Sequence, residues 1–131
     1  MQPATQAVPV SKKMLWTGRI ISALPVLLLL FAGTIKLIKP APVVQGFAHF
    51  GYPEKLILVI GILELTCAVI YAIPRSAVLG AILLTAFMGG ATATHMRIGE
   101  PFIAPVIVGV LAWAGLFLRD ERLRALLPLR S

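Results

Sequence analysis

In the stretch LILVIGILELTCAVIYAIPRSAVLGAILLTAFMGGATAT, residues 56–94, two apolar blocks are separated by a short polar break. Residues 56–73 and 77–94 are each close to the length that a helix needs to cross the hydrocarbon core of a membrane. Between them, Pro74 ends the first helix and Ser76 is placed to cap the second. The stretch therefore predicts two membrane-spanning helices joined by a tight hairpin.

Two more apolar blocks lie outside this hairpin, at residues 16–35 and 102–118. The whole chain of 131 residues is 59% hydrophobic and 13% charged, with a mean hydropathy of +0.94, which is far from the usual composition of a soluble domain. We therefore expect an all-α fold, an integral membrane four-helix bundle that forms a single domain over residues 1–131. Its expected spans are residues 16–36, 56–73, 77–95 and 102–118.

Two shorter segments have the pattern of helices that lie along a membrane surface. In the first loop, apolar residues recur on one helical face before Gly51, which predicts a short interfacial helix. These residues are Val43, Val44, Phe47 and Phe50. At the end of the last span and beyond it, residues 118–130 place leucines among arginines, which predicts a basic amphipathic C-terminal segment. The leucines of its apolar face are Leu123, Leu126 and Leu127.

The distribution of Lys and Arg predicts the orientation in the membrane, because an even number of spans puts both termini on one side. Eight of these residues fall on the side of the termini: Lys12, Lys13, Arg19, Arg75, Arg119, Arg122, Arg124 and Arg130. Four fall on the opposite side: Lys36, Lys39, Lys55 and Arg97. Since positive charge is retained on the cytoplasmic side, we expect both termini in the cytoplasm. The net charge of +7 then indicates contact with anionic membrane lipid, and no nucleic acid partner is expected because no separate basic domain exists.

Glu64 lies near the middle of the second predicted span, where a carboxylate has no water to solvate it. Counting depth at about 1.5 Å per residue places it level with Thr85 of the next span. Lys36 begins at the outer surface and has a stem long enough to bend inward. Glu64 is therefore expected either to be protonated and hydrogen-bonded or to pair with a cation. A polar clamp between helices and a functional acid both fit this position.

Polar residues also gather at the outer end of the third predicted span, in the string GGATATHMRIGEP, residues 89–101. Steps of three and four residues give this span one small, hydroxylated face. That face consists of Ala81, Thr85, Gly89, Thr92 and His95. Gly89 and Gly90 are expected to serve contact with a neighbouring helix, because no strand or lysine is present to make them a phosphate loop.

Together these groups predict a ligand site at the outer mouth of the bundle. Lys36 and Arg97 would hold an anionic or carbonyl head by charge, above a polar floor formed by Glu64. His95 would donate a hydrogen bond or pass on a proton. Cations and histidine at span ends also serve as headgroup anchors, and that alternative stays open. The candidate ligand-binding residues are Lys36, Glu64, Thr85, Thr92, His95 and Arg97, and the expected ligand is a quinone or another apolar molecule that is not covalently bound.

Other cofactor chemistry finds little support in the sequence. A single cysteine, Cys67, excludes an intrachain disulfide and a CxxC pair for thiol exchange. His49 and His95 stand outside metal-binding spacings such as HExxH, so no metal is expected, and His49 belongs to the interfacial segment rather than to a haem pocket. The sequence shows no nucleotide or flavin motif, and it leaves open whether the chain is an enzyme.

The chain resembles the DoxX-like small membrane proteins over nearly its full length. The resemblance rests on GRIISALPVLLLLFAGTIKL at residues 18–37, HFGYP at 49–53, the stretch 63–97 and WAGLFLRDERLRALLP at 113–128. It implies a four-helix integral membrane fold in the bacterial inner membrane. Relatives have been linked to a thiosulfate:quinone oxidoreductase and to oxidant-defence assemblies of the bacterial envelope, and distant animal relatives resemble assembly factors or cargo receptors. The resemblance therefore implies the fold more directly than the activity.

Two functions follow as hypotheses. The first is a membrane subunit of an envelope redox complex that presents a quinone-like molecule to a soluble oxidoreductase partner, since the chain carries neither a flavin motif nor a cysteine pair. The alternative is a non-catalytic binding or assembly protein that recognises lipid or a membrane-protein client. A transporter built from two opposed copies is disfavoured by the unequal positive charge on the two sides. The oligomeric state, a homo-oligomer included, is left open.

Overall fold

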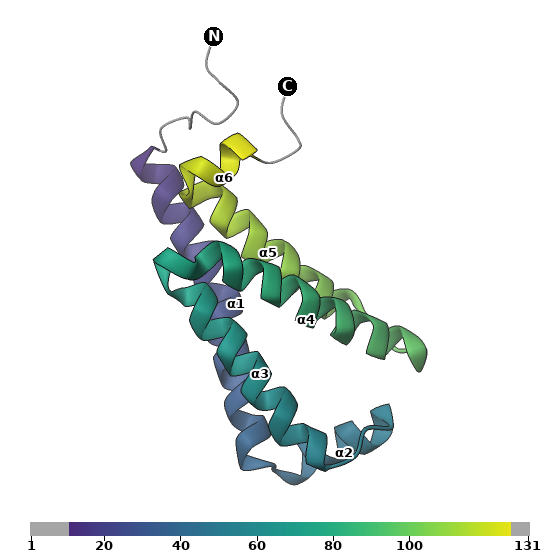
Figure 1. Ribbon diagram of the computed structural model, residues 1–131. Helices are drawn as coiled ribbons and strands as arrows, with labels where there is room; N and C mark the ends of the chain where they lie inside the picture. Colours follow the sequence, from purple (N-terminus) through teal and green to yellow (C-terminus); the bar gives the residue numbers. More distant parts are fainter. Residues whose placement is uncertain (1–10, 127–131) are drawn as a thin grey trace.

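The computed structural model describes residues 11–126, and every regular element among them is a helix (Figure 1). The elements are α1 (Lys12–Ile38), α2 (Ala41–Phe50), α3 (Lys55–Ala72), the 3-10 turn η1 (Pro74–Ser76), α4 (Ala77–Arg97), α5 (Ile103–Arg119) and α6 (Glu121–Leu126). The predicted all-α class is confirmed. Leu127 of the predicted C-terminal segment lies outside the described residues.

Three of these helices are long and apolar enough to cross a membrane: α1, α3, and α4 together with η1. The shorter apolar helix α5 has 17 residues, about 25 Å of helix against a hydrocarbon core of about 30 Å. On the outside of α1, four large apolar side chains are more than 60% exposed: Ile20, Leu27, Phe31 and Ile38. Such a surface is typical of a protein solvated by lipid. The fourth span and the interfacial position of α2 stay predictions.

The ends of α1 and α2 follow from local capping. α1 begins ahead of the apolar block because the side-chain oxygen of Ser11 accepts a hydrogen bond from the backbone nitrogen of Met14 at 3.1 Å. It ends where Lys39 adopts a left-handed conformation with φ 57°. α2 ends at Gly51, whose φ of 82° suits a residue without a β-carbon. These two turns bring the chain back so that α3 can run antiparallel to α1.

The hairpin between α3 and α4 is tight, but Ser76 does not cap α4 as the sequence predicted. Its backbone (φ −115°, ψ 12°) is not in the extended conformation that an N-cap residue uses. The hydroxyl of Ser76 turns back and donates to the carbonyl oxygen of Ile70 at 2.8 Å. The two helices meet at Gly80, where an added β-carbon would overlap the backbone of Tyr71. Only a glycine permits this approach.

α1 packs against α3 and α5, and α4 packs against the same two helices. The contacts of α1 occur where glycines leave room for the partner backbone. A β-carbon on Gly18 of α1 would lie 2.7 Å from the carbonyl oxygen of Gly115 in α5. A β-carbon on Gly61 of α3 would lie 3.2 Å from the carbonyl oxygen of Gly33 in α1. One end of α1 is therefore fixed to α5 and the other end to α3.

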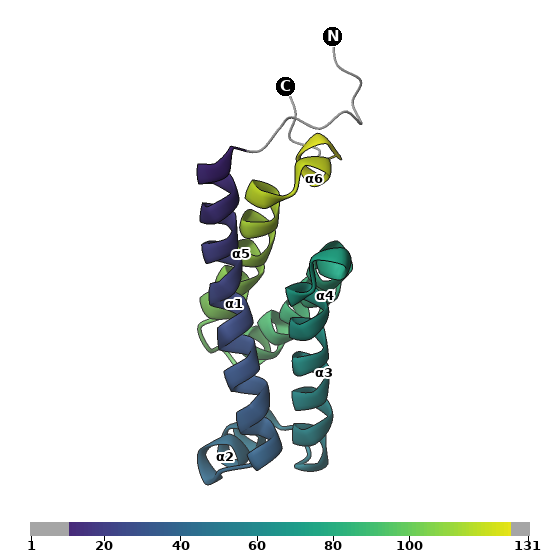
Figure 2. The ribbon, with the colours of Figure 1, turned by 90° about the vertical axis from the view of Figure 1, so that its left-hand side faces the viewer.

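The resulting arrangement has a narrow end and a wide end. α1 and α3 form one arm, α4 and α5 form the other, and the two arms diverge away from the turn between α3 and α4 (Figures 1 and 2). The core lies at the narrow end, with six side chains no more than 1% exposed: Ala68, Tyr71, Ala81, Leu84, Ala112 and Leu116. At the wide end, α2 lies beside the end of α3, on the side that faces the other arm (Figure 1). The divergence leaves space between the arms.

Candidate functional site

A cavity of about 590 Å³, here called the central cavity, lies between the two arms. Its wall is mostly apolar and comes from α1 to α5, with Phe47 and Phe50 of α2 at the wide end. Its polar lining side chains are Lys36, Tyr52, Glu64, Thr94 and His95. An apolar cavity of this size with a few polar groups is typical of small-molecule sites.

Lys36 and Glu64 form an ion pair on the wall of the central cavity. The Nζ atom of Lys36 lies 2.6 Å from Oε1 of Glu64, and the two side chains are 19% and 6% exposed. The pair forms because Gly61 has no side chain, so that the stem of Lys36 passes close to the backbone of α3. Of the two states predicted for Glu64, the structure shows the one paired with a cation. Nζ also donates to the carbonyl oxygen of Ala32 at 3.4 Å, which leaves one of its three N–H groups for another acceptor.

The segment after α2 is attached to the end of α4. The hydroxyl of Thr94 donates to the carbonyl oxygen of Gly90 at 2.8 Å, so Tyr52 is the donor in the 2.5 Å hydrogen bond between the two hydroxyls. The guanidinium of Arg97 donates to the carbonyl oxygen of Phe50. Arg97 therefore holds α2 in place beside the cavity, and it is not among the residues that line it.

His95 stands at the same end, against the ring of Phe50. The two rings meet edge to face with centroids 5.0 Å apart. The carboxylate of Glu100 lies between two histidines. Its Oε1 is 2.5 Å from Nε2 of His49, and its Oε2 is 3.7 Å from Nδ1 of His95. The second distance is that of an ion pair when His95 is protonated. Within residues 11–126 the buried Nδ1 of His95 makes no hydrogen bond. The imidazole of His95 is thus held by packing against Phe50, and its Nδ1 has no hydrogen-bond partner among the described residues.

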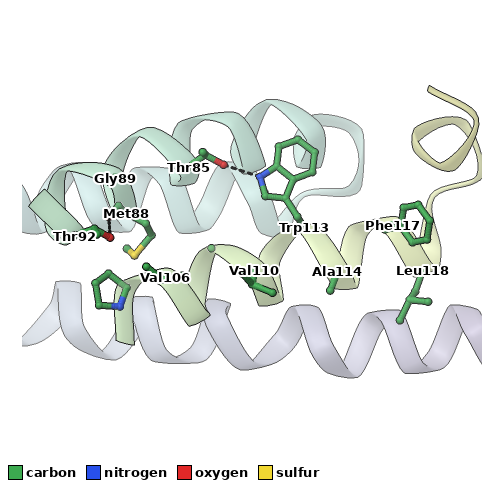
Figure 3. A pocket seen from close by; sticks show the side chains of 12 residues that line it. Thr85, Met88, Gly89, Thr92, Val106, Val110, Trp113, Ala114, Phe117 and Leu118 are labelled. Carbon is green, nitrogen blue, oxygen red and sulfur yellow. Dashed lines mark hydrogen bonds between the residues drawn. The ribbon is translucent and has the colours of Figure 1, made fainter. Parts of the chain in front are cut away.

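A second cavity of about 690 Å³, here called the lateral cavity, lies between α4 and α5 (Figure 3). Thr85 and Thr92 line this cavity and not the central one. Their hydroxyls donate to carbonyl oxygens of their own helix, at 2.8 and 2.7 Å. The oxygen of Thr85 also accepts from Nε1 of Trp113 at 2.6 Å (Figure 3). The polar groups of the lateral cavity are therefore satisfied within the protein and cannot orient a polar head.

The separation of the threonines from His95 follows from helix geometry. A helix turns by about 100° per residue, so each three-residue step from His95 to Thr92 and Gly89 rotates the side chain by about 60°. Gly89 faces the lateral cavity, whereas Thr94 and Gly90 face the central one. Tyr52 and Thr94 were missed as site residues. The sequence offered one signal for Thr94, its position next to His95.

Gly89 and Gly90 do not serve helix contact, contrary to the prediction from the sequence. A β-carbon on either residue would meet no atom within 4 Å. Gly89 lines the lateral cavity and Gly90 lines the central cavity, so α4 presents a glycine to each. Because a side chain there would project into empty space, the two glycines enlarge two cavities that lie on different sides of one helix.

The six predicted site residues therefore fall into three groups. Lys36, Glu64 and His95 line the central cavity, Arg97 fixes α2 beside it, and the two threonines belong to the lateral cavity. Among residues 11–126, no group of three His, Cys, Asp or Glu side chains is arranged to hold a metal ion. The ion pair and the ring of His95 are the polar groups best placed to contact a bound molecule.

Comparison with known proteins gives a family match. Residues 20–115 match the model of the DoxX-like family. The matched segment runs from the first turns of α1 almost to the end of α5, so it contains the ion pair, the whole lining of the central cavity and all of the lateral cavity's lining except Phe117 and Leu118. No curated protein and no solved structure matches the chain.

Proposed function

Because the chain belongs to the DoxX-like family, we propose that it is a multi-pass membrane protein whose central cavity binds a lipophilic small molecule with a carbonyl or anionic head. A quinone fits this description. The protein would present the bound molecule to a soluble oxidoreductase partner in the bacterial envelope, because its sequence carries neither a flavin motif nor a cysteine pair. In this proposal α1, α3, α4 and α5 form a membrane-spanning four-helix bundle, and α2 lies at its outer interface.

The observation that carries the proposal is the ion pair between Lys36 and Glu64 on the wall of an apolar cavity. A buried ion pair gives little net stability, because removing both charges from water offsets most of their attraction. The pair can instead serve binding. Two hydrogen bonds, to Glu64 and to Ala32, fix the ammonium of Lys36, and its third N–H group stays free for a ligand. That group can donate to a carbonyl oxygen or pair with an anionic head.

The remaining lining suits a planar ring with an apolar tail. Phe47 and Phe50 supply aromatic surface at the wide end, and the imidazole of His95 beside them can donate to a second carbonyl. Toward the middle, the wall continues with apolar side chains such as Leu28, Ile60 and Phe87. A ligand with its polar head near Lys36 and its tail among these side chains would match both the polar and the apolar parts of the cavity wall.

A second function is favoured by the lateral cavity. It is larger than the central cavity, its wall is nearly all apolar, and its hydroxyls are already hydrogen-bonded. Such a groove suits a lipid chain or the apolar side chains of a membrane-protein client. If this cavity were the site, the protein would be a non-catalytic binding or assembly protein.

Two neighbouring glycines allow the cavities to be tested separately. We expect Gly90→Leu to remove most of the thermal stabilisation that decylubiquinone gives to the detergent-solubilised protein, because the leucine fills the central cavity. At a ligand concentration of 100 times Kd, the parent should gain about 2.7 kcal/mol. The unliganded protein should melt no lower than the parent, since leucine favours a helix over glycine and a β-carbon there meets no atom within 4 Å.

Gly89→Leu is the matched control, with the same substitution at the neighbouring position, which faces the lateral cavity. It should leave the stabilisation by decylubiquinone intact. Loss of stabilisation in Gly89→Leu with retention in Gly90→Leu would move the ligand to the lateral cavity and favour the second function. Full stabilisation in both variants would show that neither cavity binds the quinone.

The proposed topology places both termini in the cytoplasm and the wide end outside. In a Cys67→Ala background, a cysteine replacing His49 should react with a membrane-impermeant maleimide in intact cells. A cysteine replacing Arg75, which is exposed in η1, should react only after the membrane is permeabilised. The reverse labelling pattern would place the mouth of the central cavity in the cytoplasm and contradict the proposed orientation.

A further inference from the structure

A third cavity, of about 300 Å³, lies at the narrow end, on the opposite side of the molecule from α2. It is lined by residues of α1, α3 and α5, among them Arg19, Ser22, Tyr71 and Arg119. We call it the arginine pocket. Its position beside Pro74, where the chain turns from α3 into α4, separates it from both cavities described above.

Arg119 is fixed in the arginine pocket by buried groups. Its Nε donates to the side-chain oxygen of Ser22 at 3.0 Å, and its guanidinium lies over the ring of Tyr71, 5.6 Å from the centroid. Tyr71 is completely buried; its hydroxyl donates to the carbonyl oxygen of Ala112 at 2.6 Å and lies 3.0 Å from Ser22. Within residues 11–126, Arg119 donates a hydrogen bond through Nε only, so the N–H groups of its two terminal nitrogens remain for another acceptor.

Arg19 brings a second guanidinium to the same pocket. It lies over the ring of Trp16, 5.0 Å from the centroid. The ion pairs found within residues 11–126 join Lys36 to Glu64 and two histidines to Glu100, and they do not involve Arg19 or Arg119. Arg19 is exposed and Arg119 is half-buried, so both cations can be reached from outside. Two cations at one pocket repel each other, and an anion between them would remove that repulsion.

We propose that the arginine pocket binds a phosphate group. Guanidinium groups match the oxygen atoms of phosphate with paired hydrogen bonds, and a pocket of about 300 Å³ has room for a phosphomonoester or phosphodiester. The pocket lies at the end of α3, the level at which a span meets the headgroups of the membrane. The phosphate can come from an anionic lipid headgroup or from a free phosphate compound. This site does not depend on the ligand of the central cavity.

The test compares three probes by the melting temperature of the protein in a neutral detergent: phosphatidylglycerol, diacylglycerol and inorganic phosphate. Phosphatidylglycerol should stabilise the parent, and diacylglycerol, which has the tails without the phosphate, should not. Stabilisation by inorganic phosphate as well would assign the site to phosphate alone, whereas stabilisation by the lipid alone would assign it to the headgroup together with its tails. Equal stabilisation by both lipids, or by none of the probes, would overturn the proposal.

Arg19→Gln is the decisive variant, because Arg19 makes no hydrogen bond that supports the fold among the described residues. It should weaken the apparent affinity for phosphatidylglycerol about tenfold or more and leave the unliganded melt nearly unchanged. Arg119→Lys, which keeps the charge and loses the fork of donors, should also weaken binding. Arg75→Gln is the matched control, since it removes one exposed positive charge near the same turn but outside the pocket. An equal loss of affinity in Arg75→Gln would show a general charge effect and contradict a defined site.

Discussion

Replacing Glu64 with lysine is expected to destabilise the folded protein by about 3–5 kcal/mol, the cost of leaving buried charge without its partner. The new ammonium would stand beside that of Lys36, in the place of a carboxylate whose side chain is 6% exposed and whose oxygen lies 2.6 Å away. Neither cation would have an anion in the cavity wall, and apolar side chains surround both. Unfolding in mixed detergent micelles, or the midpoint of a thermal melt, measures the loss.

Glu64→Leu should cost less, because it leaves a single cation whose flexible stem can move the ammonium toward water. Glu54→Lys makes the same charge change at an exposed position before α3 and should have little effect. A Glu64→Lys variant that melts with the parent would show that position 64 faces water or headgroups. The ion pair would then not be a feature of the protein interior.

Removing both charges of the Lys36–Glu64 pair separates the effect of the pair on stability from its effect on ligand binding. The double variant Lys36→Met/Glu64→Gln takes both charges out of the wall and keeps side chains of similar length, so its unliganded stability should be close to that of the parent. If the ion pair orients the ligand head, the same variant should lose the stabilisation by decylubiquinone. A stable double variant that still responds fully to the quinone would reduce the pair to a clamp between α1 and α3.

The sequence predicted the helices well because their signals are local. Continuous apolar blocks require a lipid or protein environment, Gly51 marks the end of α2, and Pro74 marks the end of α3. The position of Lys36 at the outer end of its span, with a stem long enough to bend inward, also indicated a cation for Glu64, and the structure pairs the two. Position along a helix axis can therefore be derived from the chain alone.

Rotation about the helix axis could not be derived in the same way. Thr85 and Thr92 lie about a sixth to a quarter of a turn away from His95, which is enough to move them to another cavity. The divergence of the two arms creates the central cavity, and it depends on contacts between helices far apart in the sequence. For the same reason, the pairing of Arg119 with Ser22 has no local signal.

Glycines show this limit most clearly, because their role depends on what lies opposite them. α4 carries Gly80 and Gly89 within the same kind of apolar and small-residue sequence. Gly80 is fully buried against the α3 backbone at Tyr71, whereas Gly89 opens onto the lateral cavity. One glycine permits helix packing and the other leaves space, although both look alike in the sequence.

The same substitution at these two positions should therefore have opposite effects. Gly80→Ala is expected to destabilise the protein by about 3 kcal/mol, because its β-carbon overlaps the backbone of Tyr71 and the α3–α4 hairpin must open to admit it. Gly89→Ala should leave stability unchanged or raise it by up to about 1 kcal/mol, the gain in helix propensity. Thermal melts of the two variants in one detergent measure the difference directly. Equal stability of the two would show that α3 and α4 do not pack through Gly80, and the narrow end from which both arms diverge would lose its structural basis.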